Sequence, residues 1–227
     1  MSISYLLLLV ATVDGEPAKS SLNMIQKGGP VGYIIIGLSL IALALAVMHF
    51  LQLKRSALLP PDQLTTIEEM LSTGKVDDAL NYCVNPENDT YLTRILAPAL
   101  LRYQRSAFGP FEIKSALEEA GEDQTSRLFR STDAIGLIGT VAPLLGLLGT
   151  VLGMVGAFET IGGDSASSNS ALAGNISEAL VTTMLGLILA IPCVTLFSFF
   201  RNRIEGLSAE ASSEIERLVL YLEESNG

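Results

Sequence analysis

The feature that most constrains this chain is a long apolar stretch at residues 133–158, which carries no charge after its opening aspartate. Its length matches the hydrocarbon core of a bilayer, so we predict a transmembrane helix. Residues 31–53 and 178–200 have similar length and character and predict two further spans. We therefore expect an all-α fold, a polytopic membrane protein whose three transmembrane helices are extended by a cytoplasmic helical bundle.

Small residues follow one helical face of the second and third spans at alternating steps of four and three. In lipid, small faces allow close approach of another helix. Two interpretations stay open: ordinary helix packing, or a lumen whose wall contains the small residues. The candidate pore-lining residues are Gly139, Pro143, Gly146, Gly153, Ala157, Ala179, Gly186 and Ala190.

Each small face also carries one threonine, Thr150 in the second span and Thr183 in the third. Helical rise places both about 10 to 12 Å from the same membrane surface. A threonine hydroxyl can simply bond back to its own helix, but the equal depth favours a polar belt around a lumen or partner. Glu178, where the third span begins, is either a carboxylate favoured by the helix dipole or a proton-entry group at the mouth of the lumen.

Three segments carry a family resemblance: GGPVGYIIIGLSLIALALAV at 28–47, LGLLGTVLGMVGAF at 145–158 and ISEALVTTMLGLILAIP at 176–192. They resemble the spans of the ExbB/TolQ/MotA proton-channel proteins, especially the ExbB and TolQ branch. The resemblance implies a ring-forming subunit, five copies to a ring, around a dimer of ExbD- or TolR-like single-span proteins with a membrane aspartate. It also allows a TonB- or TolA-like energy-transducing partner.

The same resemblance implies a motor of the bacterial inner membrane that is driven by the proton-motive force. Protons are then the coupling ion, with no other cofactor, and movement of the partner energises an envelope or outer-membrane transport process. Thr150, Thr183 and Glu178 form the implied proton pathway. Where the family often places a Glu-Arg pair in the first span, this chain has Met48 and His49. Two interpretations of His49 are a proton relay and a side chain that snorkels towards the interface, and we expect the second.

Composition narrows the function classes. With 49% hydrophobic and 17% charged residues among 227, the chain fits a membrane protein with one aqueous portion. A net charge of −10 without a basic cluster argues against nucleic-acid binding. The sequence has no P-loop, GxSxG, HExxH or CxxC motif and one histidine, so we expect neither an enzyme nor a metal site. Cys83 and Cys193 are expected to be inert apolar fillers.

The spans also lack any carboxylate or amine at depth, although intramembrane proton carriers usually need one. A titrating group would therefore have to come from a partner.

Charge and turn signals organise the rest of the chain. Nine of 14 Lys and Arg lie between Lys54 and Arg130 and three follow the third span, which predicts a cytoplasmic helical domain at 54–132 and a cytoplasmic amphipathic helix at 201–227. The N-terminal segment 1–30 and the loop 159–177 are then periplasmic. Residues 1–13 read equally as a signal peptide or as an interfacial segment.

Within 54–132 we predict three short helices, the first opened by a capping box of Thr65 and Glu68. The second starts at Val76, and the third covers 90–107. A long charged helix after Gly109-Pro110 should run into the second span.

Three rival functions remain. A non-conducting oligomeric membrane scaffold would use the small faces to hold copies together. A flagellar-type stator subunit belongs to the same broad family but has four spans and a larger cytoplasmic domain. A secondary transporter is disfavoured because three spans without internal repeats build no midplane site.

Overall fold

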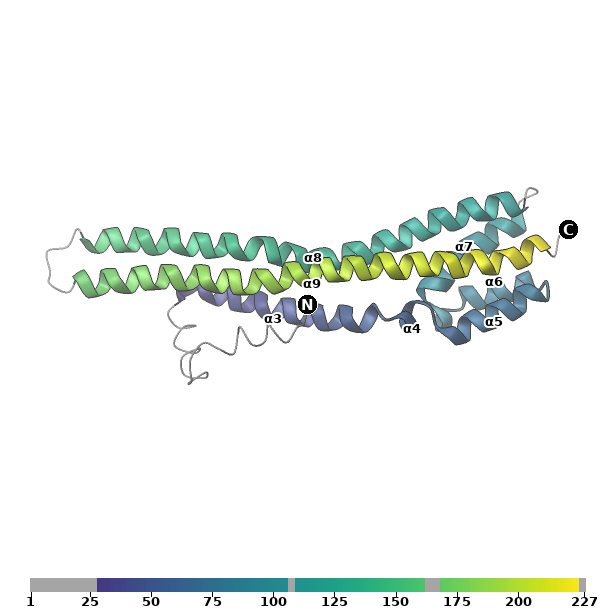
Figure 1. Cartoon of the computed structure of the whole chain (residues 1–227), viewed down its shortest axis with the longest axis horizontal. Helices are drawn as coiled ribbons and strands as arrows, with labels where there is room; N and C mark the ends of the chain where they lie inside the picture. The colour runs from purple at the N-terminus through teal and green to yellow at the C-terminus, as the bar shows by residue number, and fades with distance from the viewer. Residues whose placement is uncertain (1–27, 106–108, 162–167, 225–227) are drawn as a thin grey trace. The chain divides into compact units, whose positions relative to one another are not determined.

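The computed structural model describes residues 28–105, 109–161 and 168–224, and it is helical almost throughout these ranges (Figure 1). No strand occurs among the described residues, which confirms the all-α class. The expected interfacial segment before the first span lies outside them. The helices are α3 (Gly29–Gln52), α4 (Arg55–Leu58), α5 (Pro61–Ser72), α6 (Val76–Val84), the 3-10 turn η1 (Pro86–Asn88), α7 (Tyr91–Arg105), α8 (Gly109–Ile161) and α9 (Ser168–Glu224).

Three of these helices, α3, α8 and α9, are long and apolar enough to cross a membrane. As predicted, α8 runs without interruption from Gly109 into the second span, and α9 continues past Phe200. The loop expected at 159–177 is shorter than the sequence indicated, because α9 already begins at Ser168. Its Ser and Asn residues are typical of loops, but Leu172, Ile176 and Leu180 recur at the helical spacing of four.

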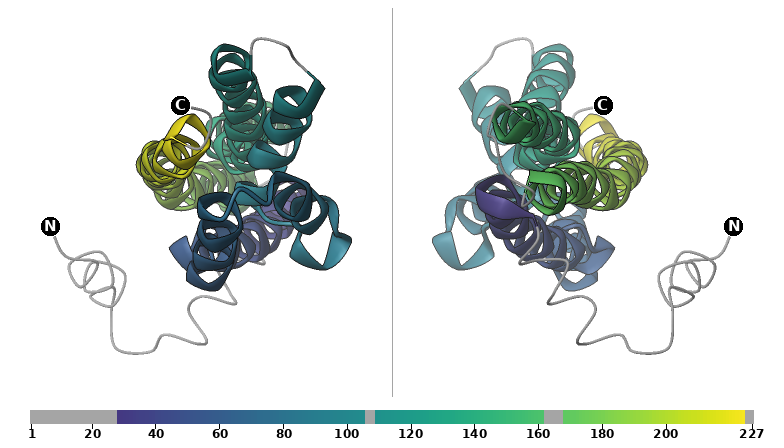
Figure 2. Two further views of the ribbon diagram at one scale, coloured as in Figure 1. Left: turned by 90° about the vertical axis from the view of Figure 1, so that its right-hand side faces the viewer. Right: turned by 90° about the vertical axis from the view of Figure 1, so that its left-hand side faces the viewer.

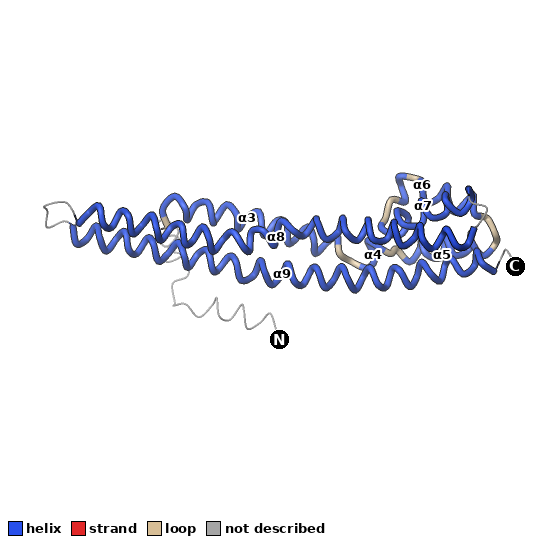
Figure 3. The backbone as a smooth tube through the Cα atoms, turned by 90° about the horizontal axis from the view of Figure 1, so that it is seen from above, coloured by secondary structure: helices blue, strands red, loops and turns tan. Residues whose placement is uncertain are grey.

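The chain forms two compact units, each built from two separate segments. The membrane unit, as we call it, contains the described residues 28–43 and 137–194. The bundle unit contains 44–136 and 195–224. Within the membrane unit, α8 and α9 run side by side in opposite directions and α3 lies along them (Figure 3). Figure 2 shows the ends of these helices grouped together when viewed along their length.

The bundle unit has an apolar core that follows the helical periodicity of its sequence. In α7 the apolar residues of one helical side are buried: Leu92, Ile95, Leu96, Ala99 and Leu100. The amphipathic stripe of the last helix is buried as well, at Ile204, Leu207, Ile215, Leu218, Val219 and Leu222. The apolar sides of α7 and of the last part of α9 therefore belong to the core of the bundle unit and are not free surfaces.

The capping box predicted at Thr65 and Glu68 is wrong. α5 starts at Pro61, four residues earlier, and the Thr65 hydroxyl donates to the carbonyl of Pro61 from inside the helix. The physical reason is Pro61 itself, because the fixed φ of proline suits the first helical position, where its missing N–H costs nothing.

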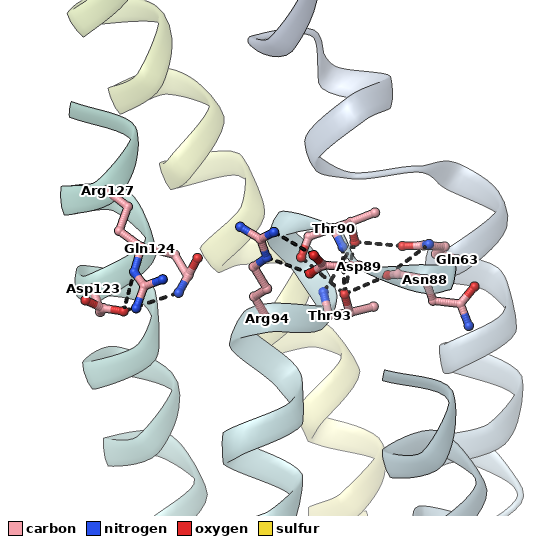
Figure 4. Close-up of polar contacts among 9 residues, drawn as sticks. All are labelled: Gln63, Asn88, Asp89, Thr90, Thr93, Arg94, Asp123, Gln124 and Arg127. Carbon is pink, nitrogen blue, oxygen red and sulfur yellow. Dashed lines mark hydrogen bonds and ion pairs between the residues drawn. The ribbon is translucent and has the colours of Figure 1, made fainter. Parts of the chain in front are cut away.

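The connection from η1 into α7 is held by a polar network (Figure 4). The Thr93 hydroxyl donates to the carbonyl of Asn88 at 2.8 Å, and the Thr90 hydroxyl donates to Gln63 Oε1 at 2.8 Å. Arg94 binds Asp89 through two hydrogen bonds of 2.6 Å, and this guanidinium holds the pKa of the Asp89 carboxyl below its usual range. The network fixes where α7 begins.

Candidate functional site

The centre of the membrane unit is a contact between the backbones of α8 and α9. A Cβ added at Gly146 would lie 2.9 Å from Thr183 Cα, and one added at Gly186 would lie 2.6 Å from the carbonyl oxygen of Ala142. Neither backbone atom can move aside as a flexible side chain would. Glycine is therefore needed on both helices for the spans to approach this closely.

Five of the eight residues predicted to line a pore lie at this contact: Gly139, Gly146, Gly153, Ala179 and Gly186. Of all eight, six are buried and two, Pro143 and Gly153, are half-buried. A Cβ at Gly139 would meet Val194 and Cys193, and one at Gly153 would meet Ala179. Within one chain these residues pack α8 against α9, which is the packing interpretation that the sequence left open. Their place in the wall of a lumen concerns an assembly of several chains and stays a prediction.

Both threonines of the predicted belt are half-buried and already use their protons. The Thr150 hydroxyl donates to the carbonyl of Leu147 in its own helix at 2.6 Å. The Thr183 hydroxyl instead crosses to α8 and donates to the carbonyl of Gly146 at 2.9 Å. A hydroxyl has one proton and two acceptor lone pairs, so both side chains can still accept a hydrogen bond.

Glu178 lies beside a half-open cavity of about 210 Å³ that is lined by residues of all three helices of the membrane unit. Its half-buried side chain rests against Gly29 in the first turn of α3. The cavity is also lined by Asn175 and Thr182 from α9 and by the glycines of α8, Gly149, Gly153 and Gly156. In a single chain, Glu178 therefore sits in a small polar chamber between helices.

Two polar residues of this chamber, Asn175 and Thr182, were not among the site residues predicted from sequence. Thr182 is only 1% exposed, and its hydroxyl donates to the carbonyl of Ala179 at 2.8 Å. It lies over Gly149, where a Cβ would collide with the Thr182 side chain. The sequence holds two signals for this contact. Gly149 and Gly153 have the GxxxG spacing typical of closely packed membrane helices, and Thr182 is adjacent to Thr183.

His49 is not a snorkelling side chain, contrary to the expectation from sequence. It is fully buried in the bundle unit, and among the described residues neither imidazole nitrogen has a partner that meets the distance and angle of a hydrogen bond. The imidazole ring packs edge-on against the Phe200 ring, with centroids 5.5 Å apart. The Phe50 ring packs in turn against the Phe200 ring, with centroids 5.0 Å apart. Burial by these aromatic rings is what keeps the imidazole from the interface.

Charge is sparse in the membrane unit. Its described residues include two ionisable carboxylates, Glu159 and Glu178, both near the end where α8 finishes and α9 begins. Over the ranges that the structure covers, no group of three or more His, Cys, Asp or Glu could hold a metal ion. The chemistry available at depth is therefore that of hydroxyls and backbone carbonyls.

Comparison with known proteins places this arrangement in a family. Residues 87–213 match the model of the MotA/TolQ/ExbB proton channel family. A biopolymer transport protein ExbB homolog from Methanothermobacter thermautotrophicus is 30% identical, covering 90% of this chain and 69% of that protein. The biopolymer transport protein ExbB-like 3 of Synechocystis is 32% identical over 84% of this chain and 91% of its own length.

Biopolymer transport protein ExbB of Pseudomonas putida is similar over a shorter region, with 32% identity across 49% of this chain and 33% of its own length. The matches cover the second and third spans together with parts of the aqueous region. They agree with the three helices that can span a membrane. The chain is a multi-pass membrane protein and belongs to the MotA/TolQ/ExbB proton channel family.

Proposed function

We propose that this chain is the ring-forming subunit of an inner-membrane motor that couples proton flow to movement of a single-span partner. The observation that carries the proposal is that the described membrane unit has no carboxylate or amine at depth, in a member of a proton channel family. Protons crossing a bilayer usually require a titrating side chain. The partner, an ExbD- or TolR-like protein with a membrane aspartate, supplies it.

The threonine hydroxyls form a binding position for this aspartate. How strongly the aspartate binds there depends on whether its carboxyl group is protonated. Thr150 and Thr183 donate to carbonyl oxygens, so in this arrangement they can accept a hydrogen bond but have no second proton to donate. A protonated carboxyl can donate to them. An ionised carboxylate needs donors, and it must either turn these hydroxyls away from their carbonyls or leave. Each proton taken up or lost therefore changes the preferred position of the partner helix.

The assembly is a closed ring, about five copies around a partner dimer, as the family resemblance implies. Large apolar side chains such as Leu147, Val151 and Ile188 are exposed on α8 and α9 and are available for lipid and for neighbouring copies. The basic residues of 54–130 support an orientation with the bundle unit in the cytoplasm and the α8–α9 connection in the periplasm. Glu178 then lies on the side from which protons enter.

The motor would energise an envelope or outer-membrane transport process, and the names of the relatives, biopolymer transport proteins, support a role in transport. A TonB- or TolA-like protein is a further candidate partner. The small residues pack α8 against α9 within one chain. This packing weakens the scaffold alternative, in which they hold copies together, and equally weakens a lumen lined by the same residues.

Native mass spectrometry of the detergent-extracted protein, co-expressed with a neighbouring single-span protein that bears a membrane aspartate, tests the proposal. The expected species is a ring of about five copies retaining two partner chains. Proton flux into liposomes containing that complex should disappear when the partner aspartate is replaced by asparagine. A monomer or dimer that retains no partner would overturn the ring, and a complex without flux would favour the scaffold.

A further inference from the structure

The carboxylate of Glu178 meets α3 at Gly29. A Cβ built at Gly29 overlaps Glu178 Oε1 and comes 2.7 Å from the carboxyl carbon. Gly29 also has a φ of +55°, in the left-handed region that side-chain-bearing residues rarely adopt. The backbone conformation therefore favours glycine at the first residue of α3, and a side chain there would push the flexible end of Glu178 away from its present position.

The chamber next to this contact suits water. Its volume of about 210 Å³ exceeds the roughly 30 Å³ that one water occupies in the liquid. The Glu178 carboxylate, the Asn175 amide and the Thr182 hydroxyl supply polar partners, and α8 lines the opposite wall with three glycines and one side chain, that of Leu152. A site that is both polar and roomy is the kind that holds ordered water.

We infer that Gly29 is a positioning residue for Glu178, because it lets the first turn of α3 close over the carboxylate and keeps it in the water-holding chamber inside each chain. The inference rests on the proposed function, in which Glu178 belongs to the proton pathway, and it adds α3 to that pathway. Proton entry then begins in a chamber between α3, α8 and α9 of one subunit.

Helix electrostatics favour this placement of the carboxylate. The first N–H groups of a helix lack intrahelical partners, and the helix dipole stabilises a negative charge beside them. A side chain at position 29 would displace Glu178 towards apolar surroundings, where an ionised carboxylate is costly. Gly29 therefore affects proton entry by controlling where the charge of Glu178 resides.

A double-mutant cycle tests the contact itself, without any measurement of transport. Gly29→Ala should lower the Tm of the detergent-solubilised protein by about 5 °C, through overlap and backbone strain. In a Glu178→Ala background the overlap is gone, so the Tm loss should shrink by at least about half, leaving the strain. Gly37→Ala is the matched control, because a Cβ there meets nothing within 4 Å. Equal Tm losses in both backgrounds would overturn the contact.

Proton flux tests the positioning role. In liposomes containing the complex with its single-span partner, Gly29→Ala should reduce flux about tenfold or more, while Gly37→Ala should stay within about twofold of the unmodified protein. Normal flux in Gly29→Ala would overturn the inference and leave the proposed function standing. If the unmodified complex carries no protons, the proposed function fails, and the Tm cycle still decides the contact.

A second pair of variants covers the case in which Gly29→Ala does not assemble. A Cβ at Gly156 would make ordinary contacts of 3.4 to 3.9 Å with Asn175, so Gly156→Ala should fold while taking space from the chamber. Gly174→Ala is its control, since a Cβ there meets nothing within 4 Å. We expect Gly156→Ala to lower flux by about threefold or more at unchanged Tm, because the methyl group displaces water. Equal flux in the two variants would contradict a water-holding chamber.

Discussion

The hydroxyl of Thr183 in α9 donates a hydrogen bond of 2.9 Å to the carbonyl oxygen of Gly146 in α8. It joins two spans at the point where both backbones are bare of large side chains. Side chain hydrogen bonds between membrane helices contribute about 0.6 to 2 kcal/mol. The bond therefore adds modest stability, and its larger effect is to fix the direction of the one hydroxyl proton.

Replacing Thr183 by valine should abolish energy coupling while leaving assembly intact. Valine keeps the branched shape and removes the hydroxyl, so the loss in stability should be about 1 kcal/mol or less. Proton flux through the complex should fall by more than about tenfold, the scale typical of a proton-handling group. Thr140→Val is the control, because its exposed hydroxyl bonds only to Leu137 in its own helix. Normal flux in Thr183→Val would remove Thr183 from the pathway.

Gly186→Ala should separate α8 from α9. The added methyl would come 2.6 Å from the Ala142 carbonyl oxygen, and either backbone must shift to relieve the overlap. Overpacking of this kind costs about 1 to 3 kcal/mol, which thermal unfolding in detergent can measure. Gly206→Ala, in the same helix with nothing within 4 Å of its added Cβ, should instead be neutral or stabilising. A Gly186→Ala protein as stable as the Gly206→Ala protein would refute the close contact.

Cys83 should resist alkylation in the folded protein. Its side chain is buried, and burial raises the pKa of the thiol to about 12. Since the thiolate is the nucleophile, the reactive fraction at pH 8 is about 10⁻⁴, against about 0.2 for a free cysteine. In a Cys193→Ala background, iodoacetamide labelling followed by mass spectrometry should be slow at pH 8 and fast in denaturant. Rapid labelling of the folded protein would show that the α6 face opens in solution.

His49→Leu should leave the protein as stable as before or raise its free energy of unfolding by about 1 kcal/mol. A buried polar group without a partner costs desolvation free energy, and leucine removes that cost while filling the space beside Phe200. Thermal unfolding of the two proteins provides the comparison. Retained proton flux would assign His49 to packing. A stable His49→Leu protein that has lost flux would instead revive the proton-relay interpretation.

Periodicity was enough to predict the fold. The apolar stretches gave three spanning helices, and the stripe from Ile204 to Leu222 is buried as its spacing indicated. Local start signals were less reliable, as Pro61 begins a helix that Thr65 and Glu68 were expected to open. The polar residues before Glu178 were read as loop because composition alone cannot separate a solvated helix from a turn.

Partners across helices were harder to foresee. Thr150 and Thr183 lie on similar small faces, yet one hydroxyl bonds within its own helix and the other crosses to α8. Burial of His49 depends on Phe200, some 150 positions later in the chain. Spacing along one helix gives the face of a residue, whereas the identity of the opposing residue depends on how two helices are rotated against each other.

The interleaving of the two units has a consequence for biosynthesis. The membrane unit needs residues up to 43 and again from 137, and the bundle unit is completed by residues after 194. At about 5 to 20 residues per second, α3 waits for several seconds of translation before α8 arrives. Throughout that interval Glu178 has not been synthesised and its contact with Gly29 cannot form. The first span must therefore persist in the bilayer as a solitary helix. Neither unit can mature before the ribosome has translated the third span.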